Sequence, residues 1–181
     1  MFSDSTILIT GGTGSFGRVF VDRIFRDYSP RKVVVYSRDE LKQYEMAEAF
    51  KRTNLRFLIG DIRESSRLAV AMKGVDYVVH AAALKQVPAA EYNPMECIKT
   101  NIHGAENVVN AAWSEGVKKV IALSTDKAAN PVNLYGATKL ASDKLFVAAN
   151  NMVGGKEPRY SESAMAMLLG PGDQSCHFFA S

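Results

Sequence analysis

The sequence predicts an α/β fold built on a doubly wound parallel sheet. Three observations lead to this prediction. Short apolar runs alternate along the chain with amphipathic segments of helical period. The runs are apolar throughout, as in parallel strands that are covered on both faces. A glycine-rich turn joins the first run to the first amphipathic segment. Right-handed crossovers then give the strand order 3-2-1-4-5.

Five strands are expected, each from a short run rich in Val, Ile or Leu bounded by polar residues or turns. The first is TILIT and the second KVVVY, and neither alternates polar with apolar positions. The expected strands are Thr6–Thr10, Lys32–Tyr36, Leu55–Ile59, Tyr77–His80 and Lys119–Leu123.

Five helices are expected between and after these strands. The first places Phe16, Val19, Phe20 and Ile24 at helical spacing, and the fourth opens with Asn93 as N-cap and Pro94 at the first helical position. The second is polar and the third short. The expected helices are Ser15–Tyr28, Glu40–Lys51, Glu64–Met72, Asn93 to about Ser114, and Asn133–Asn150.

Composition limits the class of protein. The 181 residues are 47% hydrophobic and 23% charged, enough for one soluble domain with a sizeable core. A net charge of +3, with Lys and Arg spread along the chain, argues against nucleic acid as a partner. Cys97 and Cys176 lie far apart outside any CxxC, which favours thiols in a reducing compartment over a disulfide. Without an apolar run of membrane length or a signal peptide, a cytoplasmic location is expected.

The glycine-rich turn carries the first functional signal. It reads G-x-x-G-x-x-G between a strand and a helix, where glycine lets the backbone approach a pyrophosphate at a helix N-terminus. We therefore predict a dinucleotide site, with the loop residues Gly11, Thr13, Gly14, Ser15, Phe16 and Gly17 at the cofactor.

The second strand is followed by Ser37 and Arg38, where NAD-binding proteins usually carry an acidic residue for the ribose 2′-hydroxyl. This pair suits a 2′-phosphate, so NADP is expected. Asp39 leaves NAD open, and an exposed surface arginine is the alternative interpretation. Asp61 and Ile62 are expected beside the adenine. Small residues after strand four should let the cofactor pass close to the backbone, although core packing would also explain them: Ala81, Ala82 and Ala83.

The second functional signal follows strand five. Ser124-Thr125-Asp126-Lys127 leaves the carboxyl edge of the sheet, where ligands gather. Tyr135 and Lys139 are four residues apart and share one helix face. A lysine beside a tyrosine favours the phenolate, so Tyr135 could remove a hydroxyl proton as hydride leaves. Without a cluster at metal-ligand spacing, no metal site is expected.

These motifs resemble the extended short-chain dehydrogenase/reductase family. The chain is most similar to its inverting UDP-N-acetylglucosamine 4,6-dehydratases of polysaccharide biosynthesis. The stretches that carry the likeness, over residues 6 to about 160, are ITGGTGSFG, YSRDELKQ, HAAALKQVPAAEYNP, KTNIHGAENV and STDKAANPVNLYGATKLASDKL. The expected domain is therefore a Rossmann domain at residues 1–160.

The resemblance implies a mechanism. Tyr135 with Lys139 takes the C4 hydroxyl proton, Lys127 removes the C5 proton, and Asp126 protonates the departing C6 hydroxyl. Thr125 would bond the C4 oxygen. Asn101 would order the active-site lysine through water. Other residues are expected at the sugar pocket, with solvated loop positions as the alternative: Lys85, Glu91 and Tyr92. His80 is interpreted as structural. The resemblance also implies a homo-oligomer, although a truncated chain could lack interface residues.

Past residue 161 the family-like pattern stops. Codons for Glu162–Leu169 can be chosen so that another frame spells the expected sixth strand, which suggests a frameshift and early termination. Strand five would then become a sheet edge, and residues 161–181 would form a tail outside the family.

Two alternatives to the dehydratase are a nucleotide-binding remnant without activity and a nucleotide-sugar epimerase or reductase. Asp126 beside Lys127 argues against an epimerase, which needs neither a C6 acid nor a C5 base.

Overall fold

The computed structural model describes residues 2–154 and 157–163. A single parallel sheet forms its centre, in the order β3-β2-β1-β4-β5-β6. The strands are β1 (Thr6–Thr10), β2 (Lys32–Ser37), β3 (Leu55–Ile59), β4 (Tyr77–His80), β5 (Lys119–Leu123) and β6 (Arg159–Ser163). The doubly wound parallel sheet expected from the sequence is confirmed, and the first five strands lie where they were predicted, with β2 one residue longer.

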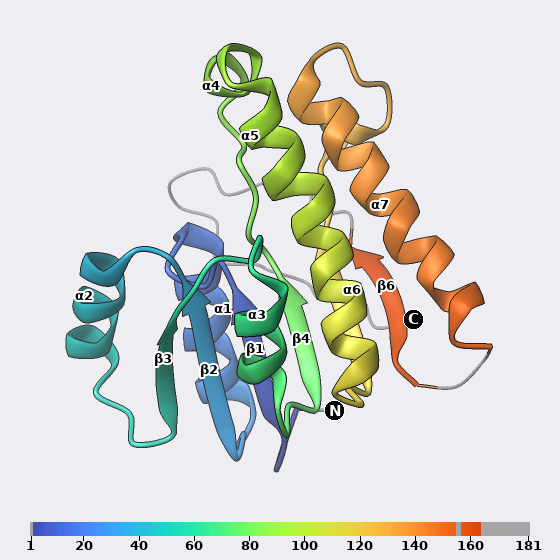
Figure 1. The fold of residues 1–181 in the computed structure, drawn as a ribbon. Helices are drawn as coiled ribbons and strands as arrows, with labels where there is room; N and C mark the ends of the chain where they lie inside the picture. Colours follow the sequence, from blue (N-terminus) through green and yellow to red (C-terminus); the bar gives the residue numbers. More distant parts are fainter. Residues whose placement is uncertain (1, 155–156, 164–181) are drawn as a thin grey trace.

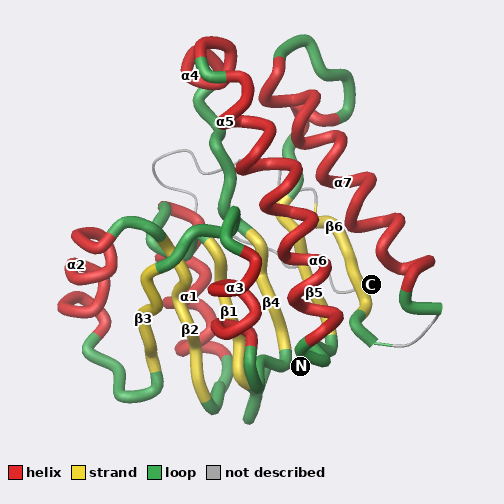
Figure 2. Tube along the Cα trace, viewed as in Figure 1, coloured by secondary structure: helices red, strands yellow, loops and turns green. Residues whose placement is uncertain are grey.

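Helices cover both faces of the sheet (Figures 1 and 2). They are α1 (Ser15–Asp27), α2 (Glu40–Phe50), α3 (Ser65–Met72), α4 (Val87–Tyr92), α5 (Pro94–Ile98), α6 (Gly104–Ser114) and α7 (Leu134–Met152). A π-helical stretch, Lys99–His103, joins α5 to α6, and a short 3-10 turn covers Asp126–Ala128.

The strands send alternate side chains into two separate cores. Leu8 and Val34 pack with α3, α6 and α7, where Phe146 is fully buried. Ile7 and Val33 face the opposite way, toward a core that includes Phe20 of α1. Because β1 and β2 are buried on both faces, they read as unbroken apolar runs.

The sheet has one strand more than expected. Strand β6 pairs in parallel with β5, so β5 is not the sheet edge that the sequence suggested. Tyr160 anchors the new strand, because its hydroxyl donates to the Val109 carbonyl at 2.9 Å. The Asn150 side chain also bonds both the backbone N–H and the carbonyl of Tyr160. The structure describes only residues 161–163 of the predicted tail, so the frameshift and the domain boundary stay predictions.

The region after β4 is also divided into more helical segments than predicted. Helix α4 was not expected, and the single helix from Asn93 is divided by the π-helical stretch. Asn93 does precede the helix at Pro94, but its side chain donates to the carbonyl of Ala89 within α4. Within the described part of the chain, no helix is both long and apolar enough to cross a bilayer.

Candidate active site

The carboxyl ends of β1, β2, β4 and β5 open onto one cavity of about 760 Å³. The glycine loop and the start of α7 both line this cavity. Nineteen of the residues predicted for the site line it, and they are Gly11, Thr13, Gly14, Ser15, Phe16, Gly17, Ser37, Arg38, Asp61, Ile62, Ala81, Ala82, Ala83, Lys85, Thr125, Asp126, Lys127, Tyr135 and Lys139.

The glycine loop needs its glycines for three different reasons. Gly11 has φ of +67°, and a Cβ there would lie 2.8 Å from the Ala82 backbone. A Cβ on Gly17 would lie 2.1 Å from the Gly12 carbonyl oxygen, so this glycine lets α1 pack onto the loop. A Cβ on Gly14 would meet only the Gly11 carbonyl, at 3.4 Å. Gly14 therefore leaves open the side of the loop that faces the cavity.

The N-terminus of α1 can receive an anion. Gly14 is its N-cap and supplies no side-chain hydrogen bond, and the first turn contains no acidic residue. The free N–H groups and the positive end of the helix dipole thus face a cavity without a competing carboxylate from that turn. A pyrophosphate is the expected occupant of such a loop and helix end, so these residues fit a dinucleotide.

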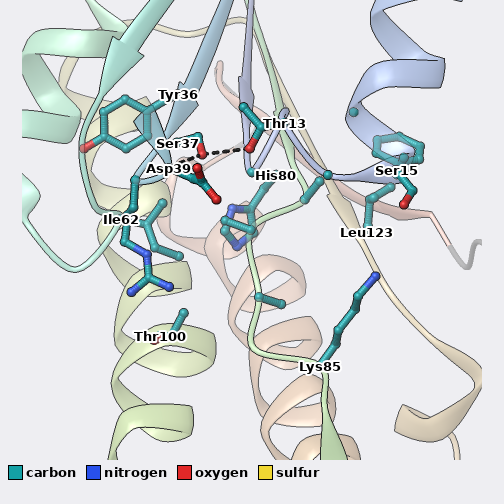
Figure 3. A pocket seen from close by; sticks show the side chains of 18 of the residues that line it. Thr13, Ser15, Tyr36, Ser37, Asp39, Ile62, His80, Lys85, Thr100 and Leu123 are labelled. Carbon is teal, nitrogen blue, oxygen red and sulfur yellow. Dashed lines mark hydrogen bonds between the residues drawn. The ribbon is translucent and has the colours of Figure 1, made fainter. Parts of the chain in front are cut away.

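Ser37 is buried, and its hydroxyl bonds the glycine loop, so it is not free to bind a ligand in the cavity. Its hydroxyl lies 2.9 Å from the Thr13 hydroxyl and accepts from the Asp39 N–H at 3.3 Å. Figure 3 shows Thr13, Ser37 and Asp39 together at one end of the pocket. Asp39 is the N-cap of α2, where its carboxylate accepts from the Lys42 N–H, and this hydrogen bond lowers the pKa of Asp39.

Two cations line the same end of the cavity. Arg38 lies 3.4 Å from the Asp61 carboxylate, and Lys42 lies 3.0 Å from that of Asp39. Burial raises the pKa of Asp61, but the hydrogen bonds from Arg63 and the charge of Arg38 outweigh it, so the pKa is lowered. Both acids are therefore ionised and already bonded. Lys42 was not predicted as a site residue. Its position as the third residue of the helix that Asp39 caps could have identified it.

The segment after β5 forms a compact polar turn. Thr125 is the N-cap of the 3-10 turn: its hydroxyl donates to Asp126 at 2.9 Å and accepts from the Lys127 N–H at 3.4 Å. The Thr125 hydrogen bond, followed by the Lys127 charge, lowers the pKa of Asp126. The Lys127 ammonium lies 3.6 Å from Asp126, and both side chains are largely exposed, at 51% and 79%. The pair is therefore a solvated ion pair in this structure.

Tyr135 and Lys139 come to the cavity from the first two turns of α7, as predicted. The Lys139 Nζ donates to the Leu123 carbonyl at 2.6 Å. Burial lowers the pKa of Lys139 despite the nearby charge of Asp143. Burial likewise raises the pKa of Tyr135, and an opposing contribution from the Thr125 hydroxyl does not outweigh it. This shift is opposite to the one expected from the Tyr–Lys pair, because desolvation dominates.

His80 lies at the centre of the cavity wall (Figure 3). Its Nδ1 lies 2.8 Å from the Thr10 hydroxyl, and the ring is 5.6 Å from that of Phe146. Burial, and then the charge of Lys139, lowers the pKa of His80 to about 3. A neutral imidazole fixed in this way supports the structural interpretation.

Three of the predicted residues are placed elsewhere. Asn101 is buried in the π-helical stretch, and its side chain bonds the backbone N–H and carbonyl of Leu84. The Glu91 carboxylate accepts from the Leu134 N–H at 2.7 Å, at the start of α7. Tyr92 is 89% exposed. None of the three is among the residues that line the described cavity.

The described residues contain no group of three or more His, Cys, Asp or Glu side chains suited to a metal ion.

Comparison with known proteins identifies the family of this chain. A family model described as polysaccharide biosynthesis protein matches residues 7–166. The chain belongs to this family. The resemblance inferred from the motifs is thereby confirmed.

Two similar proteins carry different names. A UDP-N-acetylglucosamine 4,6-dehydratase (inverting) of Campylobacter jejuni (strain 81-176) is 60% identical over 179 residues, covering 99% of this chain and 54% of that protein. A UDP-glucose 4-epimerase of Rickettsia bellii is 50% identical over 155 residues, covering 84% of this chain and 46% of that protein. The chain thus spans about half the length of the curated relatives it matches.

Solved structures show the same fold. Pen from Bacillus thuringiensis superposes with a TM-score of 0.86 at 42% identity, over 90% of this chain and 50% of that one. The dTDP-glucose 4,6-dehydratase DesIV from Streptomyces venezuelae, solved with NAD and TYD bound, gives a TM-score of 0.76 at 28% identity. It covers 82% of this chain and 52% of that one.

Proposed function

We propose that the chain carries the cofactor site and the acid–base residues of an NADP-dependent UDP-N-acetylglucosamine 4,6-dehydratase. The observation that carries the proposal is the single cavity that joins the glycine loop to Asp126, Lys127, Tyr135 and Lys139. The 60% identity to the Campylobacter dehydratase supports the substrate. We also propose residues 1–160 as the dinucleotide-binding domain.

Arg38 and Lys42 support NADP over NAD. Both line the cavity end where Ser37 and Asp39 fix the loop, and a 2′-phosphate would give them a dianion to bind. Asp39, the acid that could hold a free ribose 2′-hydroxyl, is already engaged as the N-cap of α2. Bound NADP+ would accept a hydride from the sugar C4 and return it to C6.

The protein residues then move three protons. Tyr135 accepts the C4 hydroxyl proton, and the positive charge of Lys139 would have to act against the burial that raises the pKa of Tyr135. Lys127 removes the C5 proton, which the new C4 ketone acidifies. Asp126 donates a proton to the C6 hydroxyl, which leaves as water. As hydride returns to C6, C5 takes a proton from water and Tyr135 releases its proton to water, which gives a 4-keto-6-deoxy sugar and restores the phenolate.

This assignment requires Asp126 to be protonated and Lys127 neutral, whereas the exposed 3.6 Å contact between them is that of an ion pair in water. The two forms of the pair hold the same number of protons and differ only in which side chain holds the shared one. Water favours the ion pair, and its removal favours the neutral pair. A sugar that displaces water from around the 3.6 Å contact would therefore prepare both residues for elimination.

Lys127→Ala tests the assignment. We expect the variant to oxidise C4, seen as NADPH absorbance when UDP-N-acetylglucosamine is added, without releasing the 4-keto-6-deoxy product. Lys99→Ala is a matched control, because Lys99 is 52% exposed and also pairs with a neighbouring acid, Glu96. Full dehydration by Lys127→Ala would refute the role of Lys127.

A 4-epimerase is the second candidate, because the Rickettsia epimerases share about half of the aligned residues. The same incubation separates the two. An epimerase would yield the C4 epimer with its C6 hydroxyl retained, and a dehydratase would yield a C4 ketone with a methyl group at C6. Cofactor binding without either product would identify a nucleotide-binding remnant.

A further inference from the structure

Asp143 is a buried acid that the proposed reaction does not use. It follows Lys139 by one turn of α7, and the side chains of the two residues are only 9% and 6% exposed. One carboxylate oxygen, Oδ2, accepts a hydrogen bond from the Ser124 hydroxyl. The other, Oδ1, has no hydrogen-bond partner among the described residues and lies 3.9 Å from the Lys139 Nζ.

These contacts join α7 to the end of β5 at two successive residues. Lys139 donates to the Leu123 carbonyl, and Asp143 accepts from Ser124. The next residue along the chain, Thr125, begins the turn that carries Asp126 and Lys127. The acid thus connects the Tyr–Lys helix to the loop of the proposed acid–base pair.

A buried carboxylate oxygen without a hydrogen bond is costly unless a charge compensates it. The Lys139 ammonium is the cation in a position to do so. In return, a buried lysine stays charged only with an anion nearby. The other charged and titratable groups around this pair are Glu162 of β6 and Lys144 of α7, together with Tyr135 and His80. Glu162 is exposed, so its influence is more strongly screened by solvent.

We propose that Asp143 is a positioning residue that keeps Lys139 charged at the cavity wall and, through Ser124, fixes the loop carrying Thr125 and Asp126. Only one part of this inference, the role of Lys139, rests on the proposed function. The contact between Asp143 and Lys139 can be tested without any turnover.

The test is a pH titration of Lys139 by NMR, on the full chain labelled with ¹³C-lysine. Lys139→Arg assigns the signal. We expect Asp143→Asn to lower the Lys139 titration midpoint by about one pH unit or more, because an opposite charge within about 4–6 Å is lost. Asp143→Glu should restore most of the shift, and Glu162→Gln should move the midpoint by less than half as much.

A second readout links the contact to the cofactor. NADPH fluorescence titration should show that Asp143→Asn loses about tenfold more affinity than the wild type between pH 7 and pH 9, as its Lys139 loses charge earlier. If Asp143→Asn does not fold, Asp143→Ser serves in its place.

An unchanged midpoint in the Asn or Ser variant would overturn the inference, as would an equal shift in Glu162→Gln. If the wild type binds no NADPH while Asp143→Asn still moves the midpoint, the proposed function fails and the contact stands.

Discussion

Gly17→Ala should separate steric packing from cofactor binding in the glycine loop. The added Cβ would lie 2.1 Å from the Gly12 carbonyl oxygen, whereas ordinary contact begins at 3.4 Å. The loop and α1 would have to part by about 1.3 Å, and overpacking of backbone against backbone costs about 3 kcal/mol. Alanine regains about 1 kcal/mol of helix propensity. Steric repulsion prevails, and we expect a net loss of about 2 kcal/mol.

Urea unfolding followed by circular dichroism measures this loss, and NADPH fluorescence measures binding. Two glycines provide controls. Gly14→Ala should change stability by less than about 1 kcal/mol, because its nearest contact is ordinary, but it should weaken NADPH about tenfold by filling the cavity side of the loop. Gly116→Ala has open space but φ of +69°, so it should cost about 1 kcal/mol and leave binding unchanged. An unfolding free energy of Gly17→Ala equal to that of the wild type would refute the packing argument.

Three further predictions concern other parts of the molecule. Arg38→Ala should weaken NADPH about tenfold while leaving NADH unchanged in the same fluorescence titration, since one charge-assisted contact is lost; an equal loss for both would contradict a 2′-phosphate site. Tyr160→Phe should lower the unfolding free energy by about 1 kcal/mol in urea, because the Val109 carbonyl loses its buried donor; no change would argue against the anchoring of β6. His80 has a folded pKa of about 3, below its unfolded value of about 6.5, so the unfolded chain binds more protons between them. Stability should therefore fall by about 1.4 kcal/mol per pH unit as the pH drops below about 6.5, and His80→Gln should flatten that slope in urea titrations.

Strands β1 and β2 were predictable because burial on both faces leaves an unmistakable apolar run. Strand β6 was not, because Arg-Tyr-Ser-Glu-Ser contains a single apolar side chain. Its pairing rests on main-chain hydrogen bonds to β5, on Asn150 and on Tyr160. Such long-range contacts leave no periodic signal in the strand itself.

The cavity residues were predictable where a motif fixes the backbone, as in the glycine loop and at Tyr135 and Lys139. Prediction was weaker where a side chain has an alternative partner. Asn101 and Glu91 were expected at the site, yet each bonds a backbone group that shapes the surrounding loops, at Leu84 and Leu134 respectively. Asp143 gave no signal at all, because only the fold brings Ser124 next to α7.

The two ends of the cavity hold their charges in different ways. At the cofactor end, Asp39 and Asp61 are fixed by hydrogen bonds, so their ionisation does not depend on a ligand. At the other end, the Asp126 carboxylate accepts a hydrogen bond from Thr125, but Asp126 and Lys127 are both largely exposed, so water surrounds this ion pair. Binding of NADP should therefore leave the protonation of Asp126 and Lys127 unchanged, whereas binding of the sugar should alter it. Under the proposed function, displacement of this water by the sugar is the step that would prepare Asp126 and Lys127 for elimination.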